Sequence, residues 1–175
     1  MPEVIFPGPD GRLEGRYHPE DEKDAPIALI LHPHPQFGGT MNNRVVYAMY
    51  QSFVKRGFST LRFNFRGVGR SQGKFDNGQG ELSDAATALD WMQGHNPNAS
   101  TCWIAGFSFG AWVAMQLMMR RRKRKPSPPR LCRHRWRKSQ KPPAWGLQKE
   151  RAGKTDRCLQ FRRFAGNSTF FSMRR

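Results

Sequence analysis

The 175-residue chain lacks the features that mark secreted, membrane-spanning or metal-binding proteins. Its three cysteines, Cys102, Cys132 and Cys158, are odd in number and too widely spaced for a disulfide framework or a zinc site. No stretch approaches about 18 uncharged apolar residues, and the start shows no basic stretch followed by a long apolar run, so neither a membrane span nor a signal peptide is predicted. We therefore expect a cytoplasmic protein without membrane contact, metal or cofactor.

Acidic residues are scarce in the last third of the chain. Residues 1–120 contain 11 Lys and Arg and 11 Asp and Glu, whereas residues 121–175 contain 19 Lys and Arg but, as acids, only Glu150 and Asp156. The net charge of +17 therefore lies entirely in the C-terminal segment. This break predicts two segments of different kinds: part of a folded domain over residues 1–121 and a basic, unstructured segment over residues 122–175.

The C-terminal segment also lacks an apolar run comparable to Ala25–Leu31, and we expect no strands in it. Our leading interpretation is a reading-frame shift near residue 121, after which the rest of a gene is translated out of frame. An alternative is a non-catalytic, nucleic-acid-binding arm over residues 121–163. In this arm, the basic cluster of residues 121–125 would contact phosphates, and Trp136 or Trp145 would stack on bases. A third interpretation is that the segment forms a structure that we do not recognise. In every case the charge predicts non-specific binding to polyanions.

The first 120 residues alternate between strand-like and helix-like patterns. Strand-like residues, including one continuous apolar run, are found at 4–6, 13–17, 25–31, 58–65 and 101–105. Helical spacing of apolar residues is found at 43–56, 82–94 and 111–119. The first two strands flank a turn rich in Pro, Gly and Asp, which predicts an antiparallel hairpin. The order predicts an α/β fold with about five strands, mostly parallel, and flanking helices.

A Gly-x-Ser-x-Gly motif, Gly106 to Gly110, separates the last strand-like stretch from the last helix. A strand, this motif and a helix in succession are the required context of a nucleophile elbow, a tight turn that raises the serine hydroxyl above the edge of a sheet. Glycines are required on both sides of Ser108 because side chains there would collide with the neighbouring strand and helix. The alternative is a glycine-rich turn whose serine merely caps a helix.

A loop rich in His, Pro and Gly, His32 to Thr40, follows the continuous apolar run. Two prolines prevent the strand from continuing, and Gly38 and Gly39 let the backbone bend close to a ligand. Beside an elbow, such a loop is expected to direct free backbone N–H groups at the serine. Alone, it would be a rigid connector with two surface histidines.

These motifs, in this order, resemble the N-terminal half of the small bacterial α/β-hydrolases of the dienelactone-hydrolase and carboxylesterase-like kind. The His-Pro-His-Pro-x-x-Gly-Gly-Thr-Met loop follows the third strand, and Asn64–Ser71 follows the fourth, with Asn64 where the family has Asp. Gly-Phe-Ser-Phe-Gly follows the fifth. The resemblance covers about two thirds of the chain and implies a truncated α/β-hydrolase sheet.

The resemblance implies that Ser108 is the nucleophile of a serine hydrolase acting on a small carboxylic ester or a related acyl compound. The oxyanion hole would be formed by the backbone N–H of Phe109 and by that of Gln36 or Phe37, because Pro35 has none. His34, Gly38 and Gly39 would belong to the active-site loop.

The other two members of a catalytic triad are missing from their expected places. In this fold the chain order is Ser, then Asp or Glu, then His. After Ser108 the one histidine, His134, precedes both acids, so we expect an inactive chain unless His34 or His134 reaches the serine. With no later strand expected, Cys102–Ala105 would form a bare sheet edge, and the isolated chain would aggregate or partly unfold.

Overall fold

The computed structural model describes residues 2–122, 161–163 and 168–174. It confirms the α/β fold, with the five strands and three helices that the sequence predicts in residues 1–122. The strands are β1 (Glu3–Gly8), β2 (Gly11–His18), β3 (Ile27–Leu31), β4 (Ser59–Phe63) and β5 (Thr101–Phe107). The helices are the short 3₁₀ turn η1 (Pro35–Phe37), α1 (Arg44–Val54), α2 (Gln79–His95) and α3 (Phe109–Arg122).

The sheet is mixed, with parallel central strands and the antiparallel hairpin that the sequence predicts. β3 pairs in parallel with β4 on one side and with β5 on the other. The β1–β2 hairpin instead joins the outer side of β4 in antiparallel orientation. Parallel neighbours need a long crossover, and α1 and α2 provide the two crossovers from β3 to β4 and from β4 to β5. The hairpin has no crossover, so its strands run in opposite directions.

Two further strands, β6 (Phe161–Arg163) and β7 (Ser168–Arg174), continue the sheet beyond β5. β7 pairs antiparallel with the whole of β5, so our predictions of a strandless C-terminal segment and a bare edge at β5 are wrong. A ladder forms through backbone hydrogen bonds and needs no long apolar run. Thr169, Phe170 and Phe171 are types that favour strands, but the segment is too short to stand out in a search for apolar runs.

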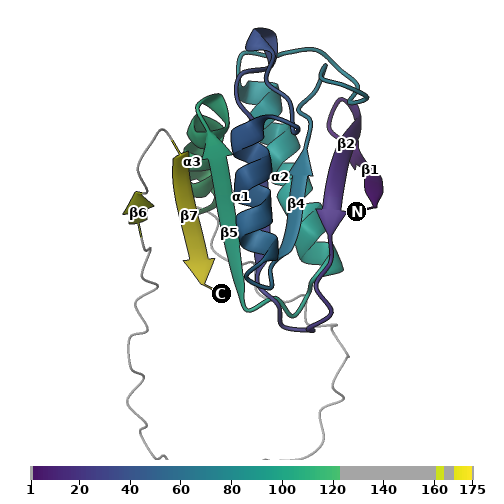
Figure 1. Cartoon of the computed structure of the whole chain (residues 1–175). Helices are drawn as coiled ribbons and strands as arrows, with labels where there is room; N and C mark the ends of the chain where they lie inside the picture. Colours follow the sequence, from purple (N-terminus) through teal and green to yellow (C-terminus); the bar gives the residue numbers. More distant parts are fainter. Residues whose placement is uncertain (1, 123–160, 164–167, 175) are drawn as a thin grey trace, which may run out of the picture.

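The sheet lies between two helical layers, with α1 on one face and α2 and α3 on the other (Figure 1). All five residues of β3 are buried, as expected for a strand covered on both faces. Ala28 and Ile30 pack on the α1 side, and Ile27, Leu29 and Leu31 pack on the side of α2 and α3. Burial of each large side chain contributes about 1.5–3 kcal/mol, so both faces hold the motifs at the ends of the strands in place.

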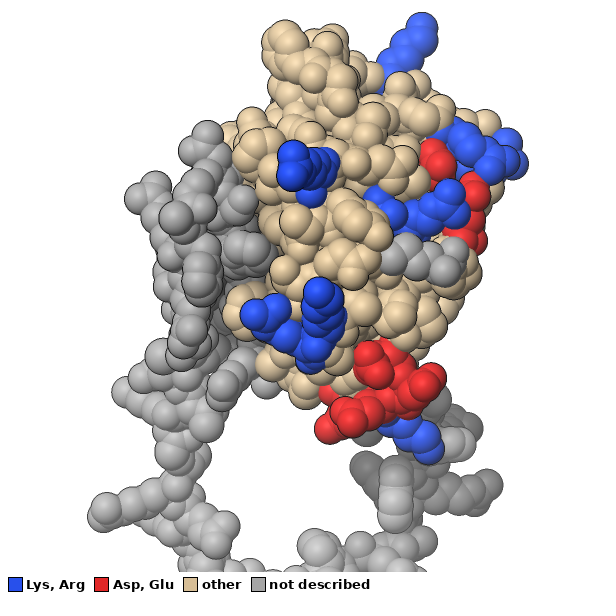
Figure 2. Space-filling view, in the orientation of Figure 1, with Lys and Arg blue, Asp and Glu red and all other residues tan. Residues whose placement is uncertain are grey.

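Charged side chains do not form one continuous basic patch on the face shown in Figure 2, where Lys and Arg occupy several separate places and acidic residues lie beside some of them. Arg16, for example, pairs with Glu3 at 3.0 Å. Most of the basic excess belongs to positions outside the described residues. Within the described ranges, Cys102 is buried in the core, and no helix is both long and apolar enough to cross a bilayer.

Candidate active site

Ser108 lies between the end of β5 and the start of α3, exposed to solvent, with a left-handed backbone φ of 53°. Residues other than glycine seldom adopt this conformation, and when they do it is often at a functional turn. A Cβ on Gly106 would collide with the backbone of Gly110, and one on Gly110 would collide with the carbonyls of Leu31 and His32. The chain therefore has the strained geometry and close packing that the sequence predicts for an elbow.

The first turn of α3 begins directly after Ser108. The carbonyl of Ser108 accepts hydrogen bonds from the N–H groups of Ala111 (3.0 Å) and Trp112 (3.1 Å), which are the first bonds of the helix. The N–H of Phe109 precedes these bonds and has no partner four residues earlier in the helix. Such N–H groups and the positive end of the helix dipole favour an anion at this position. The N–H of Phe109 thus lies at the start of α3, next to Ser108.

The His-Pro loop forms the short turn η1, with His34 as its N-cap. The N–H of Gln36 donates to Nδ1 of His34 at 3.2 Å, whereas the N–H of Phe37 donates to the His34 carbonyl at 3.2 Å. Gly38 adopts a left-handed φ of 72°, and a Cβ on Gly39 would collide with the Pro33 carbonyl, so both glycines are needed for the turn. Of the two predicted donors, Gln36 has the N–H that is held by a side chain rather than by the turn itself.

His34 lies within a group of aromatic rings. Its ring centroid is 4.8 Å from that of Phe37 and 4.9 Å from those of Phe75 and Phe109. Because Nδ1 accepts the Gln36 N–H, the proton of the neutral ring is on Nε2. A general base needs a free nitrogen lone pair, and in this arrangement neither nitrogen offers one. His34 is placed beside the elbow but is not prepared to deprotonate Ser108.

His32 is fully buried and has a structural role. Nδ1 lies 2.6 Å from the Pro33 carbonyl, and Nε2 accepts the backbone N–H of Phe65 at 3.0 Å. Burial lowers the pKa of His32 from 6.5 to about 4, so the ring is neutral at physiological pH. The ring joins the chain after β3 to the chain after β4. The two histidines of this loop are therefore not both on the surface, as the alternative interpretation had them.

An open pocket of about 320 Å³ lies beside the elbow. Its lining residues are His34, Gln36, Phe75, Asn77, Phe109 and Trp112. His34, Gln36 and Phe109 are predicted from the sequence, whereas Phe75, Asn77 and Trp112 are not. Trp112 could have been found, because it follows Ser108 by four residues and so lies one helical turn away. Phe75 and Asn77 belong to a loop whose position no local pattern reveals.

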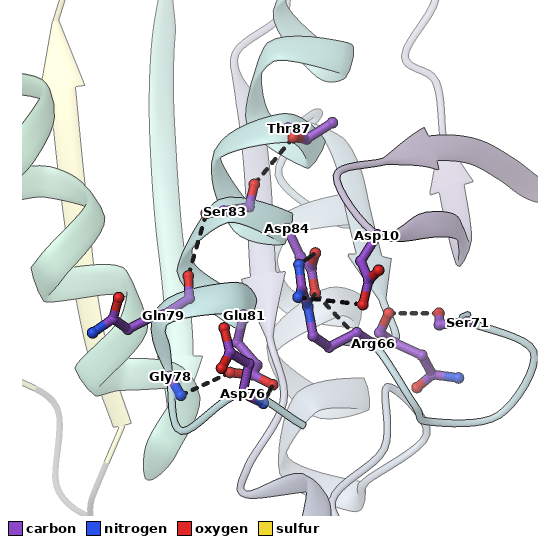
Figure 3. Close-up of polar contacts among 11 residues, drawn as sticks. Asp10, Arg66, Ser71, Asp76, Gly78, Gln79, Glu81, Ser83, Asp84 and Thr87 are labelled. Atoms are coloured by element: carbon purple, nitrogen blue, oxygen red, sulfur yellow. Dashed lines mark hydrogen bonds and ion pairs between the residues drawn. The ribbon is translucent and has the colours of Figure 1, made fainter. Parts of the chain in front are cut away.

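The loop after β4 is held by a buried ion pair. Nε and Nη2 of Arg66 donate to the two carboxylate oxygens of Asp84, at 3.0 and 2.7 Å (Figure 3). Hydrogen bonding to Asp84 raises the pKa of Arg66, so the guanidinium is always charged. A Cβ on Gly80 would collide with this guanidinium, which therefore packs directly on α2. Arg66 is engaged in fixing the loop.

Asn64, at the position where similar hydrolases have Asp, links three parts of the structure. Its Oδ1 accepts the N–H of Met41 at 2.8 Å, and its Nδ2 donates to Oε2 of Glu14 at 3.0 Å. Its carbonyl accepts the hydroxyl of Ser71 at 2.7 Å. An aspartate could not donate to the buried Glu14 carboxylate. The substitution is thus explained by the acidic neighbour on β2.

The described residues that follow Ser108 include no histidine and no acid. They comprise α3, β6 and β7, whose sequences contain neither type. His134, Glu150 and Asp156, the candidates that the sequence offers, lie outside the described residues. No group of His, Cys, Asp and Glu in the described ranges could hold a metal ion. The described residues therefore provide Ser108 at the elbow and the backbone N–H groups beside it, without a triad among them.

Residues 15–126 match the model of the X-Pro dipeptidyl-peptidase (S15) family, well over half of the chain. The chain belongs to this family. Solved structures of α/β-hydrolases are also similar to this chain. A protein of unknown function from Agrobacterium tumefaciens, assigned to the alpha/beta hydrolases, is 70% identical with a TM-score of 0.67, covering 68% of this chain and 55% of that one. An alpha-beta serine hydrolase homologue from Coxiella burnetii is 41% identical with a TM-score of 0.63, covering 66% and 56%.

Two more relatives extend the comparison. A serine hydrolase without a lid from Xanthomonas campestris is 35% identical with a TM-score of 0.62, covering 68% of this chain and 56% of that one. An uncharacterized protein of Rickettsia prowazekii is 62% identical over 121 residues, which are 69% of this chain and 51% of that protein. The chain thus spans about half the length of the relatives that it matches. Its ancestry is that of an α/β serine hydrolase.

Proposed function

We propose that residues 2–122 form the nucleophile half of a serine hydrolase that cleaves a small carboxylic ester or a related acyl compound. The observation that carries the proposal is the backbone of Ser108, which is exposed and left-handed at the N-terminus of α3. This conformation is energetically unfavourable for serine, by about 1–2 kcal/mol, so a merely structural turn would favour glycine at this position.

In the proposed reaction, Oγ of Ser108 attacks the carbonyl carbon of the ester, and the electron pair of the carbonyl double bond moves onto its oxygen. The resulting oxyanion is held by the N–H of Phe109, with the N–H of Gln36 shared between the oxyanion and Nδ1 of His34. Loss of one such donor typically removes about 3–4 kcal/mol of transition-state stabilisation. The intermediate then expels the alcohol, and water hydrolyses the acyl-serine.

The proton of the Ser108 hydroxyl needs an acceptor, and the described residues provide none in a suitable state. The free ring nitrogen of His34 carries the proton, and both nitrogens of His32 are engaged in the core. We therefore propose that this chain by itself is inactive or very slow, although its nucleophile is correctly placed. In a complete hydrolase, the residues after the elbow would contribute the base.

An ester fits this site better than a peptide bond, which is the bond that a dipeptidyl-peptidase cleaves. Cleavage of a peptide bond expels an amine, which has to be protonated by a general acid as it leaves. An activated ester expels an alkoxide or phenolate, which needs much less assistance. A half-site without an acid–base histidine therefore favours an ester or a thioester.

A chimaera tests this proposal. Residues 1–120 would be joined to the part of the Agrobacterium tumefaciens relative that this chain does not cover, since the two are 70% identical where they align. We expect hydrolysis of 4-nitrophenyl butyrate by the chimaera, a loss of at least about 100-fold in its Ser108→Ala variant, and no turnover by the natural chain. A chimaera that unfolds cooperatively but shows no Ser108-dependent turnover would refute the proposal.

Binding of polyanions by the basic segment is a second proposal, because 19 of the 30 basic residues lie in residues 121–175. Most of this segment, including Trp136 and Trp145, lies outside the described residues. If charge alone drives binding, affinities for heparin and DNA should be equal and should fall steeply with salt. A selected nucleic-acid arm would keep a preference for one sequence or structure at physiological salt.

A further inference from the structure

The pocket beside Ser108 has a lining unlike that of a general apolar groove. Four of its six lining residues have aromatic rings: His34, Phe75, Phe109 and Trp112. The ring of Phe109 lies 4.9 Å from that of His34, 6.1 Å from that of Phe75 and 5.8 Å from that of Trp112, and the last pair is stacked at 26°. Trp112 is still 42% exposed, so a large aromatic surface is open to a ligand here.

The walls of the pocket are held in place by buried contacts. The Glu81 carboxylate is fully buried and accepts the N–H groups of Asp76 (3.0 Å) and Gly78 (2.8 Å), which fixes the loop before α2 (Figure 3). Gly78 has a φ of 92°, and a Cβ on it would come within 2.6 Å of the Trp112 ring. The ring therefore packs directly on the backbone of this loop. The pocket is formed before any ligand enters.

We propose that this pocket binds a planar aromatic ring, and that the ring belongs to the acyl group of the substrate. The second clause rests on the proposed function, because it depends on acyl transfer at Ser108. Phe109 follows the serine directly and Trp112 lies one turn further along α3, so a ring between them adjoins the position of an acyl carbonyl. At about 320 Å³, the pocket suits a small ligand such as a single substituted ring.

Ring geometry favours an aromatic ligand over an alkyl chain of equal size. Aromatic pairs prefer offset-stacked or edge-to-face contacts, which strengthen an interaction by roughly 2- to 13-fold beyond the burial of area. The lining offers such faces and edges from three different elements. Polar groups are present as well: Nε2–H of His34, since its Nδ1 is occupied, and the side-chain amide of Asn77. A ring with one polar substituent would match both features.

The experiment measures binding by the full chain of three probes of similar size: phenylacetamide, cyclohexylacetamide and N-acetylprolinamide. The dissociation constants would be obtained from chemical-shift changes of the tryptophan indole N–H groups. We expect phenylacetamide to bind at least about 5-fold more tightly than cyclohexylacetamide. Equal affinities, or tighter binding of the cyclohexyl or prolyl probe, would overturn the proposal.

Matched variants locate the binding site. Met115 lies on the same helix as Trp112 with similar exposure, 39%, but does not line the pocket. Trp112→Ala and Phe75→Leu should each remove the preference for phenylacetamide, and Met115→Ala should keep it. Equal losses in all three would place the binding elsewhere and contradict the assignment.

One further variant separates this proposal from the proposed function. Ser108→Ala should retain the preference, because ring binding does not need the hydroxyl. If the chimaera described above lacks Ser108-dependent turnover while the natural chain prefers phenylacetamide, the catalytic proposal fails and the pocket stands. If the chimaera is active and the natural chain shows no preference, the reverse holds.

Discussion

Replacement of Ser108 by glycine should stabilise the protein, because the elbow holds a residue with a Cβ in a left-handed conformation, at φ 53°. This conformation is less favourable by about 1–2 kcal/mol for residues with a Cβ. Glycine relieves that strain but has more freedom in the unfolded chain, which offsets about 0.4–1 kcal/mol. We therefore expect a net gain of about 0.5–1 kcal/mol for Ser108→Gly relative to Ser108→Ala, which retains the Cβ and also lacks the hydroxyl.

Equilibrium unfolding in urea, followed by far-UV circular dichroism, measures this difference. With a denaturant dependence of about 2 kcal/mol per molar, the midpoint of Ser108→Gly should lie roughly 0.3–0.5 M above that of Ser108→Ala. Asn77→Gly is the matched control, since Asn77 has a φ of 50° but asparagine tolerates this region better, so a smaller gain is expected. If Ser108→Gly were no more stable than Ser108→Ala, the elbow would not be strained and our reasoning about Ser108 would be wrong.

Three other substitutions test the support of the site. Gly110→Ala should lower the free energy of unfolding by about 1–3 kcal/mol or prevent folding, because its Cβ meets backbone carbonyls. As a control, Gly94→Ala, in open space on α2, should raise the free energy of unfolding by up to about 1 kcal/mol. Urea midpoints would measure both changes. With its folded pKa lowered to about 4, His32 should remain neutral at pH 5, which NMR can measure. The neutral ring should contribute about 3 kcal/mol to folding above about pH 6.5, and this contribution should be lost as the pH falls from 6.5 to 4. The His32→Gln variant should lack this pH dependence of stability. Asn64→Asp should lower the free energy of unfolding at pH 7 by about 1–3 kcal/mol, because it places a second carboxylate against Glu14. Adding Glu14→Gln should restore part of this loss. An Asn64→Asp protein with unchanged thermal stability would contradict the role given to the Asn64 amide.

The elbow could be predicted from sequence because its determinants are local. A short strand, two glycines around a serine and an apolar helix leave few conformations open to Ser108, and the structure has the strained φ and the close contacts that the motif predicts. The alternation of strands and helices was likewise readable, since β3 is apolar on both faces and α1 has a clear helical period. The orientation of the hairpin relative to β4 could not be predicted from the sequence, because it depends on which edge of the sheet remains free.

Features that depend on contacts between distant residues could not be predicted. β7 was missed because an added edge strand depends on backbone pairing with β5, and its sequence shows no apolar run. The rings of His32 and His34 accept hydrogen bonds from the N–H groups of Phe65 and Gln36, which only the folded loop brings to them. From the sequence alone, one interpretation placed both histidines of this loop on the surface. The structure has one engaged in the core and one whose Nδ1 accepts the backbone N–H of Gln36.

The central claim is that Ser108 is a correctly placed nucleophile that lacks a base, and active-site labelling tests it most directly. The natural chain would be incubated with a fluorophosphonate, with and without imidazole as an external base, and modified serines would be located by peptide mass spectrometry. We predict negligible labelling without imidazole and, with it, labelling at Ser108 ahead of all other serines, abolished in Ser108→Ala. Rapid labelling of Ser108 without imidazole would show that a histidine of the chain already serves it. Labelling of other serines at equal rates with imidazole would show that the elbow confers no special reactivity.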